Sequence, residues 1–413
     1  MESAGGTVLG KNDIKVGLDI GSNQIHVVVC ERDEDYNLNI IGVGSGPSAG
    51  LRRGVIVDMD SAAAAIADAV AHAEEMSGCA AVSVLASASG THVSSIASRG
   101  VVAIGRSDRE VTQEDVDSVL EAARVVAIPP DREVVHVLPR EFVIDGCSGI
   151  RKPVGMTGIR LEVDASIITG SATAIQNIHR SARRIGLEVE HVILQPIAAA
   201  EAVLTLAEKE QGALVIDMGG ATTDIAVCIE GGVHHVASIP VGGNHVTNDI
   251  ALVMRLPVGY SEGLKLNYGS ALPDMVGENE SCGADTNISR KKLCQIIEAR
   301  ITETMELVGD ELDRARYRDL LPAGVVVTGG ASVMQGVVEV AQEVLGLPAR
   351  LGVPVGVYGA EEALDNPQYA TAVGLVKSVW SESAVIPSAD GRRPKSGGFA
   401  SEVRQWFRDI FSS

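Results

Sequence analysis

Residues 16–29 read VGLDIGSNQIHVVV, and residues 214–227 repeat the pattern as LVIDMGGATTDIAV. In each, an apolar run rich in β-branched residues ends in Asp-x-Gly and is followed by small polar residues and a second apolar run. This pattern predicts a strand, a turn and a strand. Asp19 aligns with Asp217 at an offset of 198 residues. One such unit near the start of each half predicts two duplicated α/β domains.

The composition narrows the class of protein. A length of 413 residues exceeds what one core usually serves, and 46% hydrophobic against 21% charged residues excludes disorder of the whole chain. The net charge of −20 argues against nucleic-acid binding, because such a field repels phosphate. The six cysteines are far apart in sequence and are expected to be reduced. No apolar run approaches the roughly 20 residues that a membrane span requires.

The aromatic residues are unevenly distributed. Three of the four Phe and one of the two Trp lie in the last 15 residues, FASEVRQWFRDIFSS. Residues 391–413 carry a net charge of +3, against −23 for the rest of the chain. This pattern predicts an amphipathic helix over 399–413 that binds a membrane surface. The expected membrane-binding residues are Phe399, Val403, Arg404, Trp406, Phe407, Arg408, Ile410 and Phe411. The alternative is a helix that docks on its own domain or in a partner's groove.

Changes in composition and periodicity divide the rest of the chain into segments. Strand-like segments at 101–104, 134–138 and 161–168 surround one helix that begins near Thr112, which predicts an inserted βαββ subdomain. Ser, Gly, Pro and charged residues from 381 to 398 predict a flexible linker. The expected division is 12–84 and 169–211 for the first lobe, 85–168 for the insert, 212–380 for the second lobe, 381–398 for the linker and 399–413 for the membrane helix.

The paired Asp-x-Gly turns suit phosphate chemistry. Gly21, Gly219 and Gly220 allow a ligand to approach the backbone, and the hydroxyls of Ser22, Thr222 and Thr223 offer donors to phosphate oxygens. Asp19 and Asp217 are predicted to hold a hydrated Mg²⁺ between the turns.

A third element lies at 325–336, VVVTGGASVMQG. There a strand ends in Thr328, Gly329 and Gly330 and leads into a helix, so a ring or ribose could lie against the backbone. The order of two phosphate turns and one nucleoside turn predicts a nucleotide site.

These three motifs together resemble those of the actin-like ATPase superfamily. The chain more closely resembles the FtsA family of bacterial cell-division proteins, in segments 98–112, 153–164, 239–251 and 366–375. The similarity covers nearly the whole chain. It implies an α/β, actin-like two-lobed fold of duplicated ribonuclease-H-like domains, with an inserted βαββ-type subdomain and a C-terminal amphipathic helix.

The resemblance also implies ATP and Mg²⁺ as ligands and assigns further residues. Gln195 stands where the superfamily places a side chain that orients the attacking water, and with Asp217 it would be catalytic if hydrolysis occurs. Glu262 and Lys265 would contact the nucleoside. The remaining nucleotide-binding positions implied are Asn23, Gln24, Gly242 and Gly243.

Three positions depart from the family's pattern. Gln24 stands where the family commonly has Lys beside the phosphates, and Ala221 and Ala331 replace glycines of the nucleotide turns. The loss of a cation weakens the electrostatic hold on the phosphates, and an added methyl group narrows the approach to the backbone. ATP binding with at most slow hydrolysis is therefore expected.

The function implied by the resemblance is attachment of FtsZ filaments to the inner face of the cytoplasmic membrane at the division septum. The insert would serve self-assembly into a homopolymer, and about 255–310 would contact FtsZ; further division proteins are expected partners. One alternative is a sugar-type small-molecule kinase of the same superfamily, which would have no use for a membrane helix. Another is an interaction scaffold that binds no nucleotide.

Overall fold

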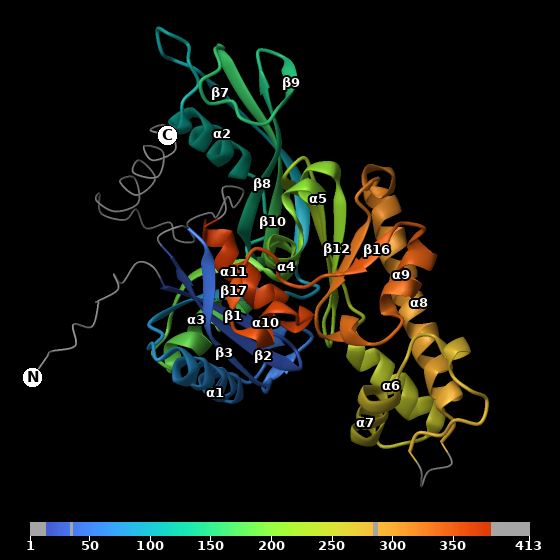
Figure 1. Ribbon diagram of the computed structural model, residues 1–413. Helices are drawn as coiled ribbons and strands as arrows, with labels where there is room; N and C mark the ends of the chain where they lie inside the picture. Colours follow the sequence, from blue (N-terminus) through green and yellow to red (C-terminus); the bar gives the residue numbers. More distant parts are fainter. Residues whose placement is uncertain (1–13, 34–35, 284–287, 381–413) are drawn as a thin grey trace, which may run out of the picture.

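The computed structural model describes residues 14–33, 36–283 and 288–380, which form two α/β lobes and a smaller projecting subdomain (Figure 1). The predicted linker and membrane helix, 381–413, lie outside the described residues. A search of the described part for helices long and apolar enough to cross a membrane finds none.

Each lobe contains its own sheet, and the two sheets have equivalent strand orders. In the first, the order is β3-β2-β1-β6-β11, with β17 beside β3, and in the second it is β14-β13-β12-β15-β16. In both, the first three strands are antiparallel and the last two run parallel to the central strand. The first sheet comprises β1 Ile14–Ile20, β2 Gln24–Arg32, β3 Leu38–Pro47, β6 Ser83–Ala88, β11 Glu188–Leu194 and β17 Tyr358–Gly359. The second comprises β12 Ala213–Met218, β13 Thr223–Ile229, β14 Gly232–Ile239, β15 Val325–Thr328 and β16 Ala349–Leu351. The predicted duplication is confirmed.

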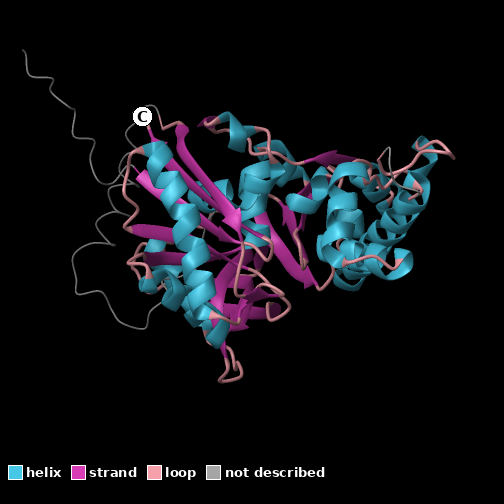
Figure 2. Ribbon diagram, turned by 90° about the horizontal axis from the view of Figure 1, so that it is seen from below, coloured by secondary structure: helices cyan, strands magenta, loops and turns pink. Residues whose placement is uncertain are grey.

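Helices cover the faces of both sheets, as Figure 2 shows in the view from below. Those associated with the first lobe are α1 Met59–Ser77, α3 Ala172–Arg184, α4 Gln195–Val203, α10 Glu361–Leu364 and α11 Ala370–Trp380. Those of the second lobe are α5 Leu206–Gln211, α6 Gly243–Met254, α7 Val258–Tyr268, α8 Arg290–Ala315 and α9 Val337–Leu345. A two-residue turn joins the short strands β4 Leu51–Arg52 and β5 Val55–Ile56.

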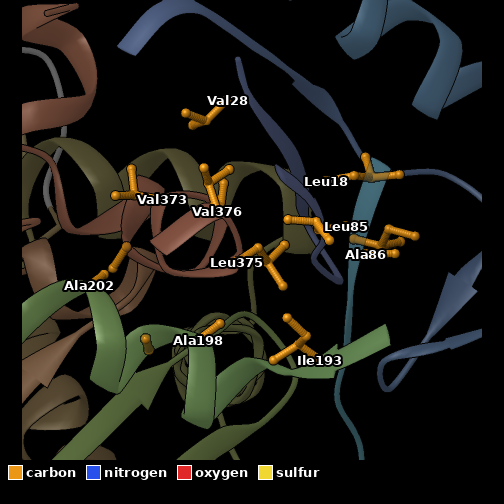
Figure 3. Close-up of a cluster of buried hydrophobic side chains, with 14 of the residues drawn as sticks. Leu18, Val28, Leu85, Ala86, Ile193, Ala198, Ala202, Val373, Leu375 and Val376 are labelled. Carbon is orange, nitrogen blue, oxygen red and sulfur yellow. The ribbon is translucent and has the colours of Figure 1, made fainter. Parts of the chain in front are cut away.

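Small residues let the two central helices, α4 and α11, pack closely. A Cβ at Gly374 of α11 would lie 1.7 Å from the carbonyl oxygen of Ala198 in α4, and one at Gly17 of β1 would lie 2.2 Å from the carbonyl oxygen of Ala372. The resulting core is aliphatic and buried, as the cluster around Leu375 and Ile193 in Figure 3 illustrates. The backbones themselves therefore approach, which fixes α11 on the first sheet although it follows the second lobe in sequence.

The insert forms its own antiparallel sheet, in the order β7-β10-β8-β9, with one helix on its face. Its elements are β7 Ser94–Ala103, α2 Gln113–Arg124, β8 Arg132–Ile144, β9 Cys147–Ile150 and β10 Arg160–Ser171. The Asp115 carboxylate accepts hydrogen bonds from the backbone N–H and the hydroxyl of Thr112, at 2.8 and 2.7 Å, at the start of α2. The subdomain matches the predicted order of strands and helix and adds the short β9.

Candidate functional site

The two Asp-x-Gly turns face each other across the lobes. The Asn23 amide exchanges two hydrogen bonds with the Asn244 amide at the start of α6, at 2.7 and 2.8 Å. A Cβ at Gly220 would lie within 2.5–2.7 Å of the Asn23 side chain. Glycine is therefore required at position 220 for the first turn to lie this close to the second.

The second turn is fixed by the first residues of α6. The N–H groups of Gly243 and Asn244 donate to the carbonyl oxygens of Gly219 and Gly220, at 3.0 and 2.8 Å. A Cβ at Gly242 would lie 2.6 Å from the carbonyl oxygen of Gly219. Gly242 and Gly243 thus lie at the predicted site, and the hydrogen bonds of residues 243 and 244 hold the turn itself.

The predicted hydroxyl groups also lie at these turns, and in this conformation all three have protein partners. Ser22 Oγ accepts the N–H of Gly54 at 3.1 Å, and Thr223 Oγ1 donates to the carbonyl oxygen of Val241 at 2.8 Å. Thr222 Oγ1 donates to the Asp224 carboxylate at 2.9 Å. The threonine hydroxyls therefore fix the shape of the second turn.

Asp19 is buried at the end of β1. Its Oδ1 accepts hydrogen bonds from Ser87 Oγ and from Gln195 Nε2, both at 2.7 Å. Burial raises the pKa of Asp19, against the opposing effects of His26 and of these two donors. Gln195, the first residue of α4, thus lies directly beside one of the two predicted magnesium carboxylates.

Asp217 occupies the equivalent place at the end of β12. Its Oδ2 accepts a hydrogen bond from Thr371 Oγ1 of α11 at 3.0 Å. Burial, followed by the nearby carboxylates of Asp224 and Asp19, raises the pKa of Asp217 to about 7. Burial likewise raises the pKa of Asp224, which accepts hydrogen bonds from Ser89 and Thr222. Three buried carboxylates lie close enough together to influence one another, which makes a bound cation favourable here.

The geometry suits a hydrated divalent cation. Among the described residues, no group of three or more His, Cys, Asp or Glu side chains is arranged to hold a metal ion by itself. Mg²⁺ usually keeps several waters and takes only one or two carboxylates together with substrate phosphates. Asp19 and Asp217 have the chemistry for that mode: if the ion were bound, these two carboxylates would hold it through its waters.

The third turn lies against Asp217. A Cβ at Gly329 would be 2.2 Å from Asp217 Oδ1, and Gly329 has a positive φ of 85°. Thr328 Oγ1 donates to the carbonyl oxygen of Gly352 at 2.8 Å. A Cβ at Gly330 would have Gln368 Cγ as its nearest neighbour, at 4.0 Å, so this position has room for a side chain.

Glu262 and Lys265 of α7 lie beside the start of α6. Lys265 Nζ contacts Glu262 Oε2 at 2.8 Å, Thr247 Oγ1 at 2.9 Å and the carbonyl oxygen of Gly243 at 3.2 Å. A Cβ at Gly243 would lie 3.7 Å from Lys265 Nζ and 3.5 Å from the methyl group of Ala331. The predicted nucleoside residues and the third turn therefore meet at Gly243.

Five polar residues of this site were not predicted from the sequence. Ser87 binds Asp19, Thr371 binds Asp217, Asn244 pairs with Asn23, and Ser89 and Asp224 bind each other across the lobes at 2.7 Å. For Ser87 and Ser89 the sequence did contain a signal, because they lie at the carboxyl end of the apolar run 83–88. Ligand sites in α/β proteins lie at the carboxyl ends of parallel strands. The eight predicted membrane-binding residues, 399–411, lie outside the described part of the chain.

Comparison with known proteins identifies the family. Residues 214–374 match the profile described as cell division protein FtsA, and residues 90–169 match the SHS2 domain inserted in FtsA. The chain is 44% identical over 368 residues to the cell division protein FtsA of Pseudomonas aeruginosa, covering 87% of this chain and 88% of that protein. It belongs to the FtsA family. The FtsA of Escherichia coli K12 is 37% identical, covering 96% of this chain and 98% of that protein.

The actin-like fold of this FtsA family member also has solved relatives. The PilM-PilN type IV pilus biogenesis complex matches with a TM-score of 0.64 at 18% identity, covering 87% of this chain and 97% of that one. MreB5 of Spiroplasma citri bound to ADP matches with a TM-score of 0.52 at 15% identity, covering 91% and 100%. At these identities the likeness shows the fold alone. The predicted fold class is confirmed.

Proposed function

We propose that this protein binds Mg-ATP between its lobes, assembles on the cytoplasmic face of the membrane and attaches FtsZ filaments to it at the division septum. The observation that carries the proposal is the meeting of three glycine turns with two buried carboxylates in a chain of the FtsA family. In this proposal the nucleotide controls assembly. It would bridge the two lobes, and so it would favour the arrangement of the lobes that assembles.

The contacts within the site support one placement of the phosphates, the metal ion and the nucleoside. The phosphates would lie between Asn23 and Gly220, with Mg²⁺ and its waters near Asp19 and Asp217. The nucleoside would lie near Gly243, Lys265 and Gly330. A protein with this arrangement should bind ATP in the presence of Mg²⁺, as isothermal titration can measure; undetectable binding would favour a scaffold that uses no nucleotide.

Slow hydrolysis is the expected activity. Gln195 has the amide group that could orient a water molecule, but here its Nε2 donates to Asp19 at 2.7 Å. Position 24, at the start of β2, carries a neutral Gln. With no Lys at that position, the developing charge on the phosphates has less stabilisation. A phosphorylation screen against sugars and polyols tests the kinase alternative, since robust transfer would contradict the role proposed here.

Exposed apolar residues support partner contacts in the second lobe. On α6, Leu252 is 78% exposed, and on α7 Leu266 is 71% exposed; Met275 nearby is 76% exposed. We propose that these three side chains belong to a docking surface, since large apolar groups exposed to water on successive elements are available to a partner. The proposed FtsZ contact at about 255–310 includes part of this surface, and the proposed self-assembly uses the insert of residues 85–168.

The proposed membrane attachment rests on the sequence of residues 399–413. Each large apolar side chain contributes roughly 1.5 to 3 kcal/mol when fully buried, but an interfacial helix is buried only in part. One tail is therefore a weak anchor, whereas adjacent subunits of a polymer would bind the same membrane with a high effective concentration. Assembly and membrane binding should reinforce each other.

The test is co-sedimentation of FtsZ filaments with anionic vesicles, with and without this protein and Mg-ATP. We expect FtsZ to sediment with the vesicles only when the protein is present. Trp406→Glu should abolish recruitment, because it places a charge on the apolar face of the tail. Trp380→Phe, in the folded part, is the matched control. Recruitment by the Trp406→Glu variant equal to the unmodified protein would contradict the membrane role of the tail.

A further inference from the structure

The hairpin of β4 and β5 lies against the first phosphate turn. The N–H of Gly54 in its turn donates to Ser22 Oγ at 3.1 Å. A Cβ at Gly54 would lie 3.0 Å from the carbonyl oxygen of Ser89, whose hydroxyl donates to Asp224 beside the second phosphate turn. The tip of this hairpin is thus held beside both turns of the proposed nucleotide site.

The residue before Gly54 is unfavourable for this turn. Strand pairing of Leu51 with Ile56 and of Arg52 with Val55 leaves a two-residue turn, Arg53 and Gly54, with φ values of 52° and 77°. Positive φ at both positions is the signature of a type I′ turn, which favours Asn-Gly or Asp-Gly. Arginine in this left-handed conformation destabilises the folded protein more than asparagine would. Backbone strain of this kind is concentrated at functional sites.

The charges around the phosphate turns are mostly negative. Asp19, Asp217 and Asp224 are buried there, and Lys265 already contacts Glu262 at 2.8 Å. Asn23 and Gln24 of the first turn are neutral. Arg53 is exposed, and it forms no ion pair with another described residue. Within the part of the chain that the structure describes, the Arg53 guanidinium group is therefore unpaired, and its residue precedes Gly54, whose N–H donates to Ser22 Oγ.

We propose that Arg53 supplies the cation that binds the phosphates of the nucleotide, in place of the residue at position 24. The inference rests on the proposed nucleotide site and adds a residue from outside its three turns. A guanidinium group binds phosphate through two parallel N–H donors, and its long side chain can extend from a hairpin tip that Ser22 holds in place.

The test is titration of the full-length protein with ATP and with adenosine, both in Mg²⁺. Arg53→Asn should weaken ATP binding roughly tenfold or more, the value for loss of a hydrogen bond to a charged group, and leave adenosine binding unchanged. Because Asn suits the turn better than Arg, the thermal unfolding midpoint without nucleotide should not fall. Arg53→Gly, which also accepts positive φ, is a second variant with the same expectation.

Two further variants make the test specific. Arg52→Asn removes the same charge one residue earlier and should change ATP affinity by less than about threefold, which is the general electrostatic effect. Adding Gln24→Lys to Arg53→Asn should restore most of the lost affinity.

Equal affinities for the Arg53→Asn and Arg52→Asn variants, or equal losses for ATP and adenosine, would overturn the role of Arg53 while leaving the nucleotide site intact. A lack of ATP binding by the unmodified protein would overturn both the nucleotide site and this inference.

Discussion

At the scale of single residues, the two glycines of the third turn have different reasons to be glycine. Gly329 has φ of 85° and no room for a Cβ, which would lie 2.2 Å from Asp217 Oδ1. Gly330 has room, since its nearest neighbour would be 4.0 Å away. The fold of the turn therefore requires glycine at position 329, whereas packing does not require it at position 330.

This difference gives a prediction. Gly329→Ala should lower the free energy of unfolding by about 2–4 kcal/mol, from left-handed backbone strain and displacement of Asp217. Gly330→Ala should change it by less than about 0.5 kcal/mol. Urea denaturation of both variants measures these changes. Similar values for the two would show that strain at residue 329 is relieved elsewhere.

Gly330→Ala should nevertheless affect the ligand. If the nucleoside lies against this backbone, the added methyl group should weaken ATP and adenosine binding to a similar extent, in contrast to the ATP-specific loss expected for Arg53→Asn. Titration of the folded variant with both ligands separates the two sites. Unchanged affinity would place the nucleoside away from Gly330.

At the scale of elements, a buried histidine joins the insert to the first lobe. His136 of β8 accepts the N–H of Leu194 of β11 at its Nε2, at 3.2 Å. Burial, with a smaller effect of the neighbouring His191, lowers the pKa of His136 to about 4 from its ordinary value of 6.5. The neutral ring is required because a protonated Nε2 cannot accept a hydrogen bond.

The sign of the pH effect follows from that lowered pKa. The folded state binds fewer protons at His136 than the unfolded state, so this contribution to stability is complete above pH 6.5 and is lost as the pH falls toward 4. The slope for one group is at most about 1.4 kcal/mol per pH unit. We expect His136→Gln, which keeps an acceptor but does not titrate, to make stability less dependent on pH in this range.

Urea denaturation between pH 4 and 7 checks this prediction. His72→Gln, at an exposed histidine of α1, is the matched control and should leave the pH dependence of the unmodified protein in place. A pH dependence that is the same in the His136→Gln variant and the unmodified protein would mean that other groups determine the acid sensitivity.

At the scale of the whole molecule, the Asn23–Asn244 pair is a direct link between the lobes. Each net hydrogen bond contributes about 0.5–1.5 kcal/mol. In a double-mutant cycle, Asn23→Ala and Asn244→Ala should therefore show a coupling of about 1 kcal/mol without nucleotide. Saturating Mg-ATP should reduce the coupling, since the phosphates would enter between these residues. Denaturation of the four proteins in urea gives the value, and a coupling near zero without nucleotide would show that the pair does not join the lobes.

Much of the fold could be predicted from local patterns. The repeated Asp-x-Gly units lie at the ends of β1 and β12, and the one helix predicted in the insert, near Thr112, is α2. The glycine turns of the site were predictable for the same reason, because each follows an apolar run that ends in glycine and small polar residues, which is a local turn signal. Ser89, Thr371 and Asn244 were not, since each acts on a residue more than 130 positions away in sequence.

The sequence by itself determined the duplication, the three glycine turns and the family of this protein, because strand periodicity and turn chemistry act between neighbours in the chain. Only the tertiary structure decided which polar groups meet there. Ser87 and Gln195 both donate hydrogen bonds to Asp19, and Thr371 donates one to Asp217. The hairpin that carries Arg53 contacts the first turn through the hydrogen bond from Gly54 to Ser22. These contacts join segments that are distant in sequence, and they form because parallel strands and closely packed small-residue helices bring those segments to the same edge of the two sheets.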